Sequence, residues 1–129
     1  MEPIVSTLLE VLDAFNQEDF DTLARRVDAH VVYRIPGRMP FSGEHHGVDA
    51  VTDAFRQLRE RSGGTLSVQP DVILTDDEHV MFTARVTGQH AGRALDVVNA
   101  YSYRIHDGKL VEGQVFPGDL HAVEAFFPI

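Results

Sequence analysis

The stretch Pro36–Val51, PGRMPFSGEHHGVDAV, is polar and carries three glycines. It lies between a short run typical of a β-strand and an amphipathic helix, so it reads as a loop. Helical patterns come before it and hairpin patterns come after it, an order that predicts an α+β protein. We expect a cone-shaped, curved antiparallel sheet that encloses one pocket with three N-terminal helices.

The first half of the chain has helical periodicity. Apolar residues recur at helical spacing over Ile4–Phe15 and Phe20–Val27, which predicts two helices. Residues 31–35 form a short β-rich run that ends at a Pro-Gly pair. A third helix is expected over Val48–Leu58, with its end marked by the Ser-Gly-Gly of residues 62–64.

The second half changes to the periodicity of strands. Pro70 lies inside the first of these strands and predicts an edge strand or a bulge. The expected strands cover residues 65–74, 79–89, 93–105 and 109–116. Helices followed by such a meander indicate helices on one face of an antiparallel sheet. No repeat or linker interrupts residues 1–129, so we expect a single domain.

Composition excludes several classes of protein. The 129 residues are 43% hydrophobic, which suits one domain with one core. The chain has no cysteine, which argues against disulfides and zinc–cysteine sites and favours a cytoplasmic location. A net charge of −9 disfavours nucleic-acid binding, and no apolar stretch is long enough to span a membrane. Neither a phosphate-binding loop nor metal-ligand spacing is present, so we expect no cofactor and no metal.

Three segments resemble the SnoaL-like group, the polyketide cyclase relatives within the nuclear-transport-factor-2-like superfamily. They are Phe41–Val51 leading into a helix, Asp107–Glu112, and Phe116–Asp119 before a short apolar tail. The resemblance covers nearly the whole chain and implies the cone-shaped α+β fold. It does not imply one activity, because the superfamily includes isomerases, cyclases, epoxide hydrolases and noncatalytic binding proteins.

The chain departs from these relatives where they carry charge. The aspartate base of the steroid-isomerase relatives corresponds to Ile35, and their helical tyrosine corresponds to Val11. Of the arginine–aspartate pair of the epoxide-hydrolase relatives, Arg85–Thr87 keeps only the arginine. The last-strand acid of the cyclase and epoxide-hydrolase relatives falls near Val115. The resemblance therefore transfers none of these mechanisms intact.

The strand over residues 93–105 carries the main candidate for a polar ligand contact. Asn99 is the single amide on a face that also carries Tyr101 and Tyr103. A buried amide without a partner costs about 1–3 kcal/mol, so Asn99 needs one. That partner is either a ligand or a group within the protein, such as Tyr33.

The register of the last strand is open. A two-residue Asp-Gly turn would place Glu112 and Gln114 on the face of Asn99. A three-residue turn closing on a left-handed glycine would place Gly113 and Val115 there instead. Alternation favours the first register and the family resemblance favours the second.

Few titratable residues remain as candidate bases. His45 and His46 are adjacent, so in an extended loop at most one of them faces a pocket. Asp119 and His121 lie on one side of an extended segment and fit a dyad, although Asp119 also suits a helix cap. Glu44 is interpreted as a loop anchor.

These residues lead to two functional hypotheses. The predicted pocket residues are Tyr33, Met39, Phe55, Asn99 and Tyr101. The first hypothesis is a cofactor-independent acid–base enzyme, of cyclase or isomerase type, acting on an apolar oxygenated substrate. Asn99 or Tyr33 would hold the oxyanion and His46, Asp119 or His121 would be the base. The second is a noncatalytic ligand-binding or dimeric scaffold protein.

We also expect a homodimer. Val98, Ala100 and Ser102 form a flat face of small residues that three short helices cannot also cover. Besides this second copy, the sequence predicts a small-molecule ligand, and it predicts binding neither to nucleic acid nor to a membrane.

Overall fold

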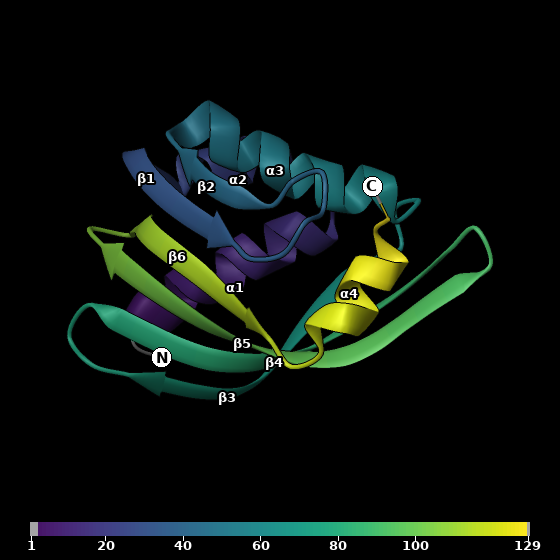
Figure 1. The fold of residues 1–129 in the computed structure, drawn as a ribbon. Helices are drawn as coiled ribbons and strands as arrows, with labels where there is room; N and C mark the ends of the chain where they lie inside the picture. Colours follow the sequence, from purple (N-terminus) through teal and green to yellow (C-terminus); the bar gives the residue numbers. More distant parts are fainter. Residues whose placement is uncertain (1–2, 129) are drawn as a thin grey trace.

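The computed structural model describes residues 3–128, and its centre is a six-stranded, curved and unclosed sheet (Figure 1). The strands are β1 (Val27–Ile35), β2 (Gly43–His46), β3 (Ser67–Thr75), β4 (His79–His90), β5 (Arg93–His106) and β6 (Lys109–Pro117). Their order in the sheet is β2-β1-β6-β5-β4-β3. The expected α+β architecture is confirmed.

Four helices accompany the sheet in the described chain: α1 (Pro3–Asn16), α2 (Phe20–Arg25), α3 (Val48–Arg61) and α4 (Leu120–Phe126). The first three lie on the inner side of the curve, and α4 lies against the extended end of the β4–β5 hairpin (Figure 1). The Asn16 amide joins α1 to β3, because its Nδ2 donates to the Val68 carbonyl and its Oδ1 accepts from the Val68 N–H, both at 2.9 Å. Within residues 3–128 no helix is long and apolar enough to cross a bilayer.

The first strand differs from its prediction. Val27, expected on a helix, begins β1, and α2 already ends at Arg25. The reason is a parallel pairing with the last strand, in which Val27 lies opposite Leu110 and the Leu110 N–H donates to the Arg26 carbonyl. The sheet is therefore mixed and not purely antiparallel as expected. The local sequence of residues 27–30 does not indicate pairing with a strand that lies more than 80 residues away.

Two short elements were not predicted. Residues 43–46, expected in a loop, form β2, which pairs antiparallel with β1 at the sheet edge. Three of its four residues are exposed, so it lacks the apolar alternation that marks a strand. The tail after Asp119 forms α4, which makes four helices where three were expected.

The structure resolves the register of β6. Asp107 and Gly108 form a two-residue turn with φ of 50° and 72°. Arg104 lies opposite Glu112, whereas Ile105 lies opposite Leu110, so Val111 is an extra residue in a bulge. The turn is that of the first register, yet the bulge brings Gly113 and Val115 to the inner face. The bulge expected near Pro70 is also present, between Pro70 and Ile73.

Candidate functional site: a buried tyrosine-lined cavity

The inner face of the sheet and the helices enclose a cavity of about 80 Å³. A single water needs roughly 10–15 Å³ on this measure, so several waters or a small molecule fit. The five residues predicted to line a pocket all line this cavity: Tyr33, Met39, Phe55, Asn99 and Tyr101. Tyr103, which sequence reasoning left out of the pocket, lines it as well. Its alternation with Asn99 and Tyr101 on β5 was the signal that could have included it.

The walls are apolar except for one amide and three phenols, those of Asn99, Tyr33, Tyr101 and Tyr103. Among the residues the structure describes, no carboxylate, imidazole, ammonium or guanidinium lines the cavity. The chain has only three tyrosines, so every one of them lies in this wall.

Two of the phenols are directly paired. The Tyr33 and Tyr103 hydroxyl oxygens lie 2.7 Å apart, and either can donate to the other. The rings meet edge to face with centroids 5.7 Å apart. One hydroxyl proton makes the bond between them, and the second has no acceptor among residues 3–128. That proton is available to a molecule in the cavity.

Asn99 has partners within the protein. Its Oδ1 accepts from the Gly118 N–H at 3.3 Å, and its Nδ2 donates to the Tyr101 hydroxyl at 3.4 Å. Both distances are long, and Nδ2 carries a second proton. The amide therefore has partners within the protein, which was one of the two alternatives, and it also lines the cavity.

Burial keeps these phenols protonated. It raises the pKa of Tyr101 to about 12. Burial, with a smaller contribution from the neighbouring tyrosines, raises the pKa of Tyr33 well above its usual value. Burial likewise raises the pKa of Tyr103, partly opposed by the hydrogen bond to Tyr33. At neutral pH the cavity thus offers neutral hydrogen-bond donors.

The other three candidate catalytic residues lie outside this cavity. His46 is exposed on β2, with Nε2 2.7 Å from Glu44 Oε1. Asp119 caps α4, where Oδ1 accepts from the Ala122 N–H at 3.0 Å. His121 is exposed on α4. The structure therefore brings Tyr33 and Asn99 together at one site without these three residues.

Positions where charged or phenolic groups occur in relatives are apolar here. Val11, Ile35 and Val115 all line the cavity. Arg85 faces the opposite side of the sheet, where its Nη2 lies 2.6 Å from Asp96 Oδ2. Three of the departures noted in the sequence therefore lie in the cavity wall, where they lower its polarity, and the retained Arg85 lies away from the cavity.

The fold and the buried cavity define a small α+β pocket protein. Residues 8–113 match the SnoaL-like domain family, and the chain belongs to this family. This confirms the resemblance found in the sequence. No curated protein matches the chain in sequence.

Solved structures show the same fold. Bal32a, from a soil-derived mobile gene cassette, has a TM-score of 0.91 at 27% identity, with 97% of this chain and 96% of that chain covered. A protein of unknown function with a cystatin-like fold from Xanthomonas campestris has a TM-score of 0.88 at 28% identity, with 96% and 97% covered. An NTF2-like protein from Burkholderia pseudomallei K96243 has a TM-score of 0.85 at 17% identity, with both chains fully covered.

Proposed function

We propose that this protein binds a small, neutral and largely apolar molecule that carries a carbonyl-type oxygen. The observation that carries the proposal is the unused hydroxyl proton of the Tyr33–Tyr103 pair, inside an otherwise apolar cavity. A ligand oxygen that accepts this proton satisfies a buried donor, which is worth about 0.5–1.5 kcal/mol. Tyr101 and Asn99 add further donors along the same wall. The apolar remainder of the wall suits a hydrocarbon or aromatic skeleton.

The residues of the cavity wall also favour a ligand without charge. A buried anion requires a cation or several strong donors, because it loses its hydration. In the described part of the chain no cationic side chain lines the cavity. We therefore expect ketones and related neutral compounds to bind better than carboxylates of the same shape.

Three probes of similar size test this proposal: acetophenone, ethylbenzene and benzoate. Binding is followed by NMR shifts of backbone amides around the cavity. Acetophenone should bind tightest, ethylbenzene more weakly because it has no acceptor, and benzoate weakest. A double variant with Tyr33→Phe and Tyr103→Phe should lose most of the preference for acetophenone over ethylbenzene, because it removes both hydroxyl donors of the pair. Equal or tighter binding of benzoate would overturn the proposal.

A second candidate function is cofactor-independent acid–base chemistry of the cyclase or isomerase type. The phenol protons favour it, because donors of this kind stabilise a developing oxyanion. Such a reaction also needs a base that reaches the carbon acid. Since no carboxylate or imidazole of residues 3–128 lines the cavity, binding without catalysis is the better supported proposal.

Deuterium exchange separates the two candidates. In D₂O, a catalytic site of this type would speed exchange of the acetophenone methyl protons, which NMR follows directly. We expect no acceleration above buffer. Acceleration that the double variant Tyr33→Phe with Tyr103→Phe abolishes would establish the catalytic candidate instead.

A further inference from the structure

Gly113 occupies the place in the sheet directly between the two paired tyrosines. On one side of β6 it lies opposite Tyr33 of β1, and on the other side it lies opposite Tyr103 of β5. Both rings stand on the inner face. Their hydroxyl groups meet at 2.7 Å although a whole strand separates their backbones.

The missing side chain of Gly113 makes this meeting possible. A Cβ at this position would lie 2.6 and 2.7 Å from two ring carbons of Tyr33 and 3.1 Å from a ring carbon of Tyr103. Cβ atoms do not approach other atoms to 2.6 Å, so the Tyr33 ring would have to move. The Tyr33 ring also meets the Phe55 ring edge to face, with centroids 4.8 Å apart.

The backbone does not require a glycine here. The φ angle of Gly113 is not positive, so a residue with a side chain could adopt the same backbone conformation. A glycine inside a strand also lowers stability by roughly 0.5–1 kcal/mol relative to alanine. The space that the two rings occupy is therefore the physical reason for glycine at this position.

The bulge at Val111 brings the glycine into place. Without the extra residue, side chains of the opposite alternation, those of Glu112 and Gln114, would point inward. A carboxylate would then lie where the rings meet. The bulge sets the register that places Gly113 on the inner face. The missing side chain of Gly113 then leaves room for the two tyrosine rings.

We propose that Gly113 is a positioning residue for the ligand site, because its lack of a side chain lets Tyr33 and Tyr103 join into one hydrogen-bond donor. The inference has two halves. The ligand half, that Gly113 affects ligand binding, rests on the proposed function. The geometric half, that Gly113 allows the two tyrosine hydroxyls to meet, does not depend on any ligand. Adding one methyl group should separate the hydroxyls and weaken the contact to a carbonyl oxygen.

The geometric half is tested without ligand, by ¹³C NMR of the tyrosine Cζ atoms. The three tyrosines give three signals, which single Tyr→Phe variants assign. Gly113→Ala should shift the signals of Tyr33 and Tyr103. The matched control is Gly88→Ala, at another buried strand glycine, whose added Cβ would lie 3.1 Å from Phe126. This control should leave both signals in place, and unchanged signals in Gly113→Ala would overturn the inference.

The ligand half is tested by a double-mutant cycle with acetophenone. Gly113→Ala should weaken binding about three- to tenfold, the worth of one hydrogen bond. In a background with both Tyr33→Phe and Tyr103→Phe the same change should have almost no further effect, because both hydroxyl donors of the pair are already lost. Shifted tyrosine signals with unchanged affinity would overturn the positioning role. No binding to the wild-type protein would instead overturn the proposed function, and the tyrosine signals would still decide the geometry.

A second variant covers the case in which Gly113→Ala does not fold. Tyr33→Leu in the same chain removes the ring that the new methyl group meets. Recovered folding would attribute the damage to that ring and support the inference. Failure to recover would overturn it.

Discussion

Asn99 is the residue whose interpretation the structure changes most. Its amide accepts from the Gly118 N–H and donates to the Tyr101 hydroxyl while it faces the cavity. Replacing it removes hydrogen bonds inside the protein as well as any contact to a ligand. Its contribution to stability can therefore be measured without knowing the ligand.

We expect Asn99→Leu to lower the free energy of unfolding by about 1–3 kcal/mol, because it leaves the Gly118 N–H without this acceptor. Urea unfolding measures the change. Glu60→Ala, at an exposed position of α3, is the control and should change stability by less than about 0.5 kcal/mol. Unchanged or higher stability of Asn99→Leu would show that its amide serves only a ligand.

Thr52 provides a prediction of the opposite sign. Its buried hydroxyl on α3 has no hydrogen-bond partner within the described residues. Thr52→Val replaces this hydroxyl by a methyl group of similar shape. Since an unsatisfied buried polar group costs about 1–3 kcal/mol, we expect the melting temperature to rise. A lower melting temperature would show that Thr52 has a partner in solution.

The buried phenols predict how stability depends on alkaline pH. In the unfolded chain a tyrosine ionises near 10, whereas burial raises the folded pKa of Tyr101 to about 12 and that of Tyr33 and Tyr103 also upward. Between these values the unfolded chain binds fewer protons than the folded one. Stability is therefore fully present below pH 10 and falls as the pH rises toward 12.

The phenolate absorbance of the protein measures this directly, because all three tyrosines line the cavity. We expect no titration near pH 10 in the folded protein and a normal titration in denaturant. Ionisation of one tyrosine near pH 10 in the folded protein would show that water reaches that phenol.

At the scale of elements, α4 completes the cavity wall. Val123 and Phe127 contribute to it, and Phe127 meets Phe41 of the β1–β2 loop edge to face at 5.0 Å. Two polar contacts hold the helix: Glu124 Oε2 accepts from the Arg38 N–H at 2.8 Å, and Arg93 Nε donates to the Phe126 carbonyl at 3.3 Å. The seven-residue α4 and its C-cap therefore form part of the cavity wall.

Asp119 could act as the N-cap of α4 or through the charge of its carboxylate, and two substitutions distinguish these roles. As a cap, Asp119 can be replaced by asparagine with little loss, whereas alanine should destabilise the helix by about 0.5–2 kcal/mol. Hydrogen exchange of the α4 amides should show faster opening in Asp119→Ala only. If Asp119→Asn were as damaging as Asp119→Ala, the carboxylate charge and not the cap would be important.

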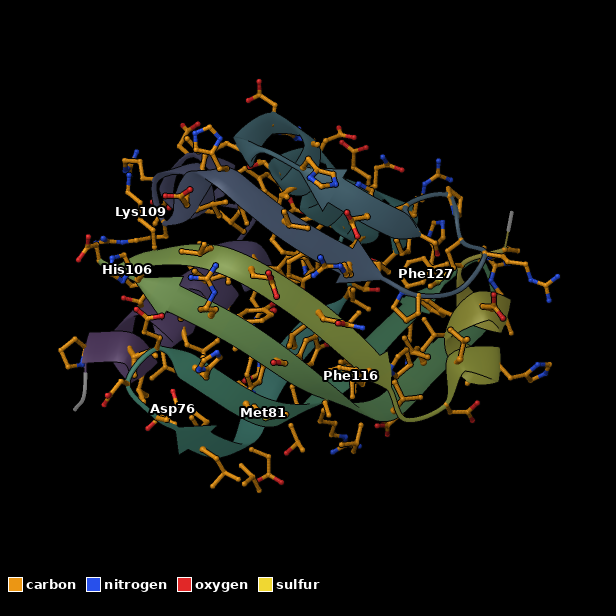
Figure 2. The ribbon with its side chains drawn as sticks, turned by 60° about the vertical axis from the view of Figure 1, so that its left-hand side comes forward. Asp76, Met81, His106, Lys109, Phe116 and Phe127 are labelled. Carbon is orange, nitrogen blue, oxygen red and sulfur yellow. The ribbon has the colours of Figure 1, made fainter. Side chains whose placement is uncertain are left out.

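At the scale of the whole molecule, the outer face of the sheet carries exposed apolar side chains beside the Arg85–Asp96 ion pair. The exposed large hydrophobic residues form an outer patch on β3, β4, β5 and β6: Val72, Leu74, Met81, Val98 and Phe116. Figure 2 shows Met81 and Phe116 on this side of the sheet. Leu74 lies opposite Met81, and Phe116 lies opposite Ala100, so apolar side chains are paired between β3 and β4 and between β5 and β6.

We propose that a second copy of the chain covers this outer patch, since a patch of this kind on a sheet face suits a two-fold interface. Light scattering at micromolar concentration should give the mass of a dimer. Phe116→Glu should give monomers, because it places a charge within the interface. Ala50→Glu, on the exposed side of α3, is the control and should remain dimeric. A monomeric wild-type protein would contradict the proposal.

The periodicity of the sequence determined most elements and the inner face of β5. Helical spacing predicted α1 and α3, and alternation placed Asn99, Tyr101 and Tyr103 on one face, where the structure has them. Four of the five predicted pocket residues, Tyr33, Phe55, Asn99 and Tyr101, line the cavity for the same reason: side-chain direction within one helix or strand depends on local periods.

Only the tertiary structure decided how these elements meet. The parallel pairing of β1 with β6, the bulge at Val111 and the position of Gly113 between two tyrosines depend on hydrogen bonds and ring contacts between distant residues. Gly113 and the polar residues of β2 carry no local signal of their partners. Whether a given histidine or aspartate faces the cavity is likewise settled by packing between elements, which no local period encodes.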